Sequence, residues 1–166
     1  VALTSAGRSD NWASSPMTAW DLSSGEADTN VVPLTNVYTW AQSSDGTYIA
    51  YFGEEGYPNT KVHIWNRRTR REDLDLPIKV QLMPDSLAFS PDGSRLAALI
   101  GEPKAVRIWS IPDGAEIGTL PIDADFINKL AWSPDSQTLA ITQKTGVLLV
   151  DAAKNHPLKV LNTIHP

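Results

Sequence analysis

Three histidines are the residues of this sequence best suited to metal binding or proton transfer. His63, His156 and His165 stand far apart along the chain. A helical metal site of the His-x-x-x-His kind, or a His-Glu motif, would need a second ligand at a fixed short spacing, and none of the three has one. We therefore expect exposed or hydrogen-bonded histidines and predict no metal site.

Carboxylates are the next candidates, because paired carboxylates can act as general acid and base. Asp45, Asp92 and Asp135 recur at equivalent turns. Three groups at three repeated turns lie too far apart to form a catalytic pair, so we expect each to cap its own turn by bonding nearby backbone. Residues 123–125 and 54–55 are acidic but offer fewer oxygens than a calcium loop needs.

Other chemical signatures are missing from the sequence. There is no cysteine, which excludes disulfides, thiolate nucleophiles and zinc–thiolate sites. There is no Gly-x-Ser-x-Gly elbow and no phosphate-cradling glycine loop. The net charge of −5 gives no general attraction to nucleic acid or anionic lipid, and no apolar run is long enough to cross a membrane. The sequence thus predicts a non-enzyme with no catalytic residue and no cofactor.

One basic cluster stands out, formed by Arg67, Arg68, Arg70 and Arg71. We place it at a turn between two strands. The acidic residues that follow, 72–75, offer local partners, which favours a solvated hairpin. The alternative is a weak contact with an anion or an acidic partner.

The chain repeats itself at intervals of 41 to 47 residues. Residues 86–97 (SLAFSPDGSRLA) match residues 129–140 (KLAWSPDSQTLA), and residues 40–50 form a weaker copy. A second motif follows each copy and also occurs once before them, at residues 18–22, 62–66, 106–110 and 147–151. A period in this range is typical of propeller-type repeats.

Each repeat is predicted to hold four strands. In residues 86–120, the strands 86–90, 95–100, 105–110 and 115–120 are separated by turns or breakers such as Ser90-Pro91-Asp92-Gly93. The first repeat offers strands only at 1–6, 17–22 and 29–32. The prediction is an all-β β-propeller segment of about four four-stranded antiparallel blades, the first incomplete, with boundaries near 1–32, 33–76, 77–120 and 121–166.

These motifs resemble the WD40-like β-propeller family, in the form with Ser-Pro-Asp-Gly turns that is common in bacterial proteins. The resemblance covers residues 18–163, although Trp20-Asp21 is the only literal Trp-Asp pair. No Gly-His pair precedes a first strand, so the His–Asp–Ser–Trp network typical of the family is not expected. A resemblance to the related propeller repeats of periplasmic translocation proteins and prolyl oligopeptidases is the alternative. By the resemblance, Trp20, Trp65 and Trp109 are expected to pack between blades.

An open arc of fewer than four blades leaves sheet edges and faces uncovered. The chain begins inside a repeat, so we expect the C-terminal part of a longer propeller. Closure by a second copy, or by a partner subunit, is the alternative.

The connections between blades are the predicted recognition surface, since scaffolded loops carry binding. Loops joining fourth to first strands, and second to third strands, would share one face of a propeller. That face would present Trp12, Tyr57, Met83 and Phe126, residue types common in interface cores.

The leading functional hypothesis is a non-catalytic protein–protein interaction scaffold, as a subunit or part of a larger assembly. The alternative is a propeller that docks or gates substrate for an enzyme domain, such as a peptidase or kinase, outside this chain. A small-ligand module using the central channel is the third hypothesis and has the least support.

Overall fold

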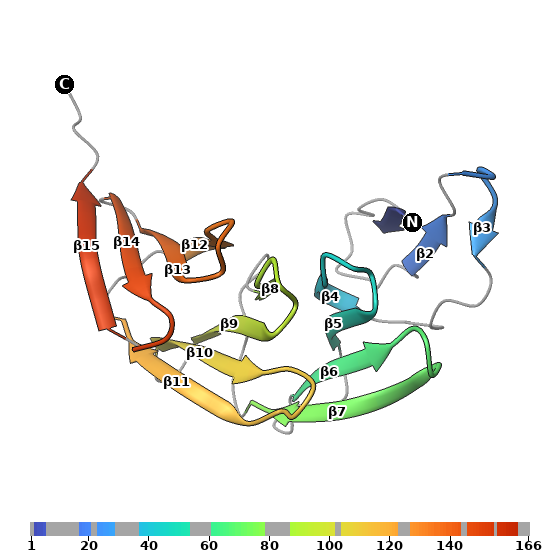
Figure 1. Ribbon diagram of the computed structural model, residues 1–166, viewed down its shortest axis with the longest axis horizontal. Coiled ribbons are helices and arrows are strands. Elements are labelled where there is room, and N and C mark those ends of the chain that lie inside the picture. The colour runs from blue at the N-terminus through green and yellow to red at the C-terminus, as the bar shows by residue number, and fades with distance from the viewer. Residues whose placement is uncertain are drawn as a thin grey trace.

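The structure is a computed structural model that describes the chain in ten stretches. These are residues 2–5, 17–20, 23–28, 37–53, 61–78, 87–101, 104–122, 127–143, 146–154 and 156–162. Within them the regular secondary structure is β-strand, and the strands form four separate antiparallel sheets (Figure 1). No helix in these stretches has the length and apolar character that crossing a bilayer requires.

The four sheets follow one another along the chain, and each is built from consecutive strands. Blade 1 holds β1 (Ala2–Ser5), β2 (Met17–Trp20) and β3 (Ala27–Asp28). Blade 2 holds β4 (Val37–Gln42), β5 (Tyr48–Gly53), β6 (Lys61–Asn66) and β7 (Arg71–Pro77). Blade 3 holds β8 (Leu87–Phe89), β9 (Arg95–Gly101), β10 (Lys104–Ser110) and β11 (Glu116–Pro121). Blade 4 holds β12 (Ile127–Trp132), β13 (Thr138–Gln143), β14 (Gly146–Asp151) and β15 (His156–Asn162).

The predicted fold class is confirmed. Blades 2, 3 and 4 each have four strands in sequence order, and blade 1 has three. The copy of the second motif at residues 62–66 lies within β6. In blade 1 the predicted last strand, 29–32, lies outside the described residues, and the described pairing with β2 involves Ala27 and Asp28.

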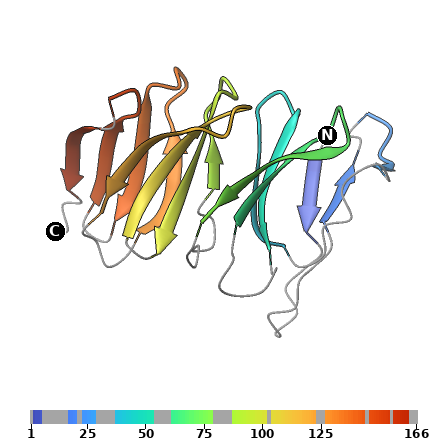
Figure 2. The ribbon, with the colours of Figure 1, turned by 90° about the horizontal axis from the view of Figure 1, so that it is seen from below.

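Blades 1 to 4 lie side by side in an open arc (Figures 1 and 2). The first strands β4, β8 and β12 lie on the inner side of the arc, and the fourth strands β7, β11 and β15 lie on its outer side. Because neighbouring strands are antiparallel, each blade has two ends. At one end lie the turns that join first to second and third to fourth strands, and at the other lie the remaining connections.

Alternation along the strands decides which side chains fill the spaces between blades. On β6, Val62 and Ile64 are fully buried against blade 3, whereas Trp65 packs on the opposite face of blade 2. Successive side chains of a strand point to opposite faces, so a blade between two others needs apolar residues on both. This explains why the middle strands of blades 2 and 3 are nearly continuous in apolar residues.

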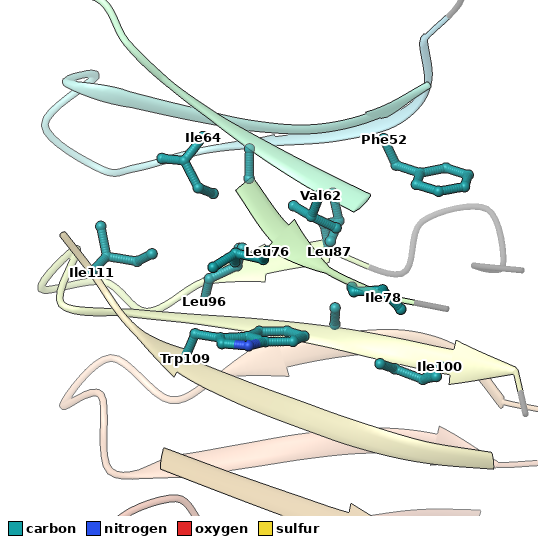
Figure 3. Close-up of a cluster of buried hydrophobic side chains, with 12 residues drawn as sticks. Phe52, Val62, Ile64, Leu76, Ile78, Leu87, Leu96, Ile100, Trp109 and Ile111 are labelled. Carbon is teal, nitrogen blue, oxygen red and sulfur yellow. The ribbon is translucent and has the colours of Figure 1, made fainter. Parts of the chain in front are cut away.

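The core between blades 2 and 3 is one cluster of buried side chains (Figure 3). Ile64, Leu76 and Ile78 come from blade 2, and Leu96 and Trp109 face them from blade 3. A second cluster, including Leu99 and Ile108 of blade 3 and Leu139 and Ile141 of blade 4, fills the next space. The hydrophobic effect therefore holds blade to blade, in addition to the ladders within each sheet.

Gly114 provides a test of this packing. It lies in the turn between β10 and β11 with φ 71°, and an added Cβ would lie 3.2 Å from Cδ2 of Leu74 in blade 2. Gly93 has a similar φ of 72°, but a Cβ there meets only Cβ of Ser43, at 3.9 Å. The left-handed backbone costs a non-glycine residue about 1–2 kcal/mol at either site. Crowding should add about 1 kcal/mol or more at Gly114 alone.

We therefore expect Gly114→Ala to lower the free energy of unfolding by more than Gly93→Ala. Urea titration followed by circular dichroism measures both. Equal losses would show that Leu74 moves aside and that the two turns are not packed differently.

Candidate functional site

The four apolar residues predicted to form the recognition face lie outside the described residues. Trp12, Tyr57, Met83 and Phe126 therefore stay predictions as contact residues. The structure does place the strand ends that flank three of these connections. Consecutive strands of a blade run antiparallel, so the second and fourth strands end where the first and third strands begin. The same end of the blades therefore holds the ends of β5, β7 and β11 and the starts of β6, β8 and β12.

The arginine cluster lies at the opposite end of the blades, in the turn between β6 and β7. Nη1 of Arg67 donates to the carbonyl oxygen of Gly46, 3.3 Å away, and its backbone N–H donates to Thr47. Arg70 adopts a left-handed φ of 58° and donates its backbone N–H to Asn66. Arg68, Arg70 and Arg71 are exposed. The predicted turn is thus correct, and the turn presents positive charge to solvent.

The three repeated aspartates cap their turns as predicted. Ser43 Oγ donates to Asp45 at 2.6 Å, Ser90 Oγ to Asp92 at 2.6 Å and Ser133 Oγ to Asp135 at 2.5 Å. In each case the backbone N–H two residues beyond the aspartate also donates to its carboxylate, at 3.0 Å. These carboxylates fix the hairpins that join the first and second strands of blades 2, 3 and 4.

Hydrogen bonds to the charged form lower the pKa of these carboxyls. The Ser43 hydroxyl, with Thr47, lowers the pKa of Asp45 to about 2 from 3.8. Burial raises the pKa of Asp92, but the hydrogen bonds from Ser90 and Ser94 lower it by more, so the net pKa lies below the ordinary value. The pKa of Asp135 is lowered chiefly by the Ser133 hydroxyl.

Stability should therefore fall in acid. A carboxyl whose pKa is lower in the folded state binds its proton more readily when unfolded, so its contribution is present above pH 3.8 and is lost as the pH falls towards 2. Asp45→Asn keeps an acceptor oxygen but cannot titrate. We expect this variant to show a shallower loss of unfolding free energy between pH 4 and pH 2 than the wild-type chain, measured by urea titration. Parallel curves would contradict this role of Asp45.

The tryptophans occupy one repeated position but differ in burial. Trp109 is 3% exposed in the core between blades 2 and 3, as predicted. Trp65 is half-buried and packs with Ile49 and Tyr51 on the face of blade 2 that points away from blade 3. Trp20 is 39% exposed, so the prediction that it is packed between blades is wrong in this chain. The position faces the preceding blade, and no described blade precedes blade 1.

The structure brings together a group that sequence spacing did not predict, formed by His63, Glu72 and Asp75. His63 lies on β6 opposite Asp75 on β7. The register shift after Ile64 pairs Trp65 with Glu72 and so brings the Glu72 carboxylate to the same face. Nδ1 of His63 is 2.9 Å from Oδ1 of Asp75 and 3.5 Å from Oε2 of Glu72.

The surroundings fix each member of this group. The His63 side chain is 2% exposed and its ring stacks on Tyr51, with ring centres 4.8 Å apart. The Tyr51 hydroxyl donates to Oε1 of Glu72, and Nζ of Lys61 lies 2.8 Å from Oδ2 of Asp75. Burial raises the pKa of Asp75, but Lys61 and His63 outweigh it, so the net pKa lies below the ordinary value. A buried imidazole with two fixed carboxylates can hold a cation or lock the hairpin.

The only signal for this group in the sequence was indirect. Metal-binding histidine motifs place their ligands a few residues apart, whereas Glu72 and Asp75 are 9 and 12 residues from His63. A hairpin with its turn at residues 67–70 places position 63 opposite the second half of β7, so the register would have suggested Asp75. The position of Glu72 depends on the bulge and was not predictable.

Comparisons with known proteins find WD repeat relatives. No family model matches the chain. It is 30% identical over 142 residues to Protein HIR1 of Coccidioides immitis, covering 71% of this chain and 13% of that protein. It is 31% identical over 85 residues to WD repeat and SOCS box-containing protein 1 of Mus musculus, covering 51% and 20%. It is 38% identical over 73 residues to Coronin-7 of Mus musculus, covering 44% and 8%.

A solved structure shares the fold. Hydrazine synthase of Kuenenia stuttgartiensis matches with a TM-score of 0.65 and 20% identity, over 82% of this chain and 38% of that chain. This identity supports a likeness of fold alone. The chain spans between 8% and 20% of the length of the three curated relatives named above. The chain is a β-propeller segment whose homologues are WD repeat proteins.

Proposed function

We propose that this chain is a non-catalytic interaction scaffold that works as part of a larger propeller ring. WD repeat proteins are generally protein-interaction modules, and its relatives are of this kind. The observation that supports a larger ring is the open face of blade 4. Its residues occupy the same positions as the residues of the buried faces of blades 2 and 3.

This equivalence follows from strand register. In blade 3, Ala97 pairs with Ile108, and Val106 pairs with both Leu99 and Leu120. Blades 2 and 4 have the same pairings at the matching positions. The three sets are Ala50, Phe52, Val62, Ile64 and Leu76 in blade 2, Ala97, Leu99, Val106, Ile108 and Leu120 in blade 3, and Ala140, Thr142, Val147, Leu149 and Leu161 in blade 4.

Burial separates the third set from the first two. All five side chains are buried in blade 2, where blade 3 covers them, and in blade 3, where blade 4 covers them. In blade 4 the same positions are half-buried or exposed, with Leu161 at 42% exposure. Four of the five remain apolar, which favours a contact surface over a solvated one. Its proposed occupant is a further four-stranded blade presenting apolar side chains, as blade 4 does to blade 3.

A partner protein would dock at the end of the blades where β5, β7 and β11 end. Trp12, Tyr57, Met83 and Phe126 belong to the connections that we assign to this end. Antiparallel strands hold the flanking ends rigidly, so the connections have a fixed base. The arginine turn lies at the other end and would serve a separate, acidic contact.

Affinity purification with the full chain as bait tests the docking end. The first variant replaces Trp12, Tyr57, Met83 and Phe126 together with alanine. The matched control replaces Arg68 and Arg71, at the opposite end, with alanine. We expect partners recovered by the wild-type chain to be lost with the first variant and kept with the control. The reverse pattern would overturn the proposed docking end and assign binding to the arginine turn.

A further inference from the structure

We propose that His63, Glu72 and Asp75 form a binding site for one divalent transition-metal ion, and that Zn²⁺ is the ion that fits best. The proposal is independent of the scaffold function, because the group lies on the strands of blade 2 and not on the connections assigned to docking. It rests on the ligand types, on their geometry, and on the repeat-equivalent site in blade 3.

Two of the three separations between ligand atoms are already close to those of a tetrahedral site. Zinc binds imidazole nitrogen and carboxylate oxygen at about 2.0–2.2 Å, so neighbouring ligands of a tetrahedral ion are about 3.3 Å apart. Nδ1 of His63 is 3.5 Å from Oε2 of Glu72 and 2.9 Å from Oδ1 of Asp75. All three ligand atoms lie within 4.8 Å of one another. The distances from His63 need to change by only a few tenths of an ångström. The two exposed carboxylates need to move closer to each other by a larger amount to complete the geometry.

Each carboxylate ligand is held by a partner outside the site. One oxygen of Glu72 accepts the Tyr51 hydroxyl and the other faces His63. One oxygen of Asp75 faces Nζ of Lys61 and the other faces His63. The two outer partners can therefore stay in place when an ion enters. Such outer partners orient ligands and raise metal affinity.

The matching position in blade 3 holds a permanent cation. Arg107 occupies the place of His63, Glu116 the place of Glu72, and Thr119 the place of Asp75. The Arg107 guanidinium lies 3.8 Å from the Glu116 carboxylate. Blade 2 replaces this arginine with a shorter group that has no permanent charge, and adds a second carboxylate. A cation therefore lies beside the carboxylate in blade 3, and a metal ion would take that place in blade 2, where Lys61 contacts the other oxygen of Asp75.

The site is open on the side where an ion would enter. Glu72 and Asp75 are exposed, and residues 72–75 line an open pocket. Water can supply the fourth ligand from this side. One nitrogen and two oxygen ligands favour zinc and its neighbours over calcium or magnesium, which prefer oxygen ligands only. The imidazole must be neutral to bind, so protons compete with the metal.

Isothermal titration with ZnCl₂, and the visible spectrum with Co²⁺, test the site on the full chain after chelator treatment. We expect one ion per chain and a four-coordinate Co²⁺ spectrum. Glu72→Gln and Asp75→Asn should each weaken zinc binding at least tenfold. Glu116→Gln, at the matching position in blade 3, should bind as the wild-type chain does.

His63→Gln is the third ligand variant, and circular dichroism shows whether it folds. If it does not fold, the two exposed carboxylate variants decide the question. The proposal is overturned if the wild-type chain binds no zinc at millimolar concentration, or if Glu72→Gln and Asp75→Asn bind as tightly as Glu116→Gln. Equal affinity for Ca²⁺ and Zn²⁺ would also overturn it, because that result indicates a general attraction to surface carboxylates.

Discussion

Replacing Trp109 with alanine is expected to lower the free energy of unfolding by about 3–5 kcal/mol, the range for truncating a buried aromatic. The side chain is 3% exposed and lies in the cluster that joins blades 2 and 3. Its ring fills the space against side chains of both sheets (Figure 3). Truncation removes apolar contact area and leaves a cavity that two rigid sheets cannot close.

The repeat supplies matched controls for this prediction. Trp65 holds the same position in blade 2 and is half-buried, and Trp20 holds it in blade 1 and is 39% exposed. Trp65→Ala should have an intermediate effect, and Trp20→Ala should cost less than about 1 kcal/mol. Urea titration followed by circular dichroism gives the three values. If Trp109→Ala cost no more than Trp20→Ala, the cluster between blades 2 and 3 would not be a stabilising interface.

The repeat period made the fold predictable from the sequence. A turn of the Ser90-Pro91-Asp92-Gly93 kind fixes where two strands meet, and alternation on either side fixes their faces. Three complete blades and one incomplete blade followed from counting these units. β9 (Arg95–Gly101) and β10 (Lys104–Ser110) differ from the predicted bounds by only one residue at one end.

Burial was less predictable, because it depends on neighbours that the repeat pattern does not count. Trp20 and Trp109 stand in similar motifs, and their exposure differs because only Trp109 has a described blade before it. Val106 and Val147 are likewise identical residues at one repeated position, and only Val106 has a described blade after it. A sequence pattern therefore predicts on which face of a blade each side chain lies. Whether that face is buried depends on whether another blade covers it.

The candidate site was unpredictable for a different reason. The grouping of His63 with Glu72 depends on the bulge after Ile64, which is a property of strand pairing and not of spacing. The same position holds Arg107 in blade 3 and Leu148 in blade 4. The repeat therefore fixes the place of this side chain but not its charge, and the residue type in each blade determines what the position can bind.

Val106→Asp is the second substitution for which a large effect is expected. Val106 is 1% exposed between blades 3 and 4, where an aspartate would be an unpaired charge in an apolar cluster. We expect a loss of more than about 4 kcal/mol, enough to unfold a marginally stable chain. The same change at Val147 puts the charge on the open face of blade 4 and should cost less than about 1 kcal/mol.

The pair of variants also tests whether a further blade covers blade 4. Circular dichroism reports folding, urea titration reports stability, and sedimentation at two protein concentrations reports association. A folded, monomeric Val147→Asp chain beside an unfolded Val106→Asp chain is the expected result. Equal losses at the two positions would mean that the face of blade 4 is already covered in the purified chain. Because valine is the residue at both positions, the difference between the two variants measures what a neighbouring blade contributes.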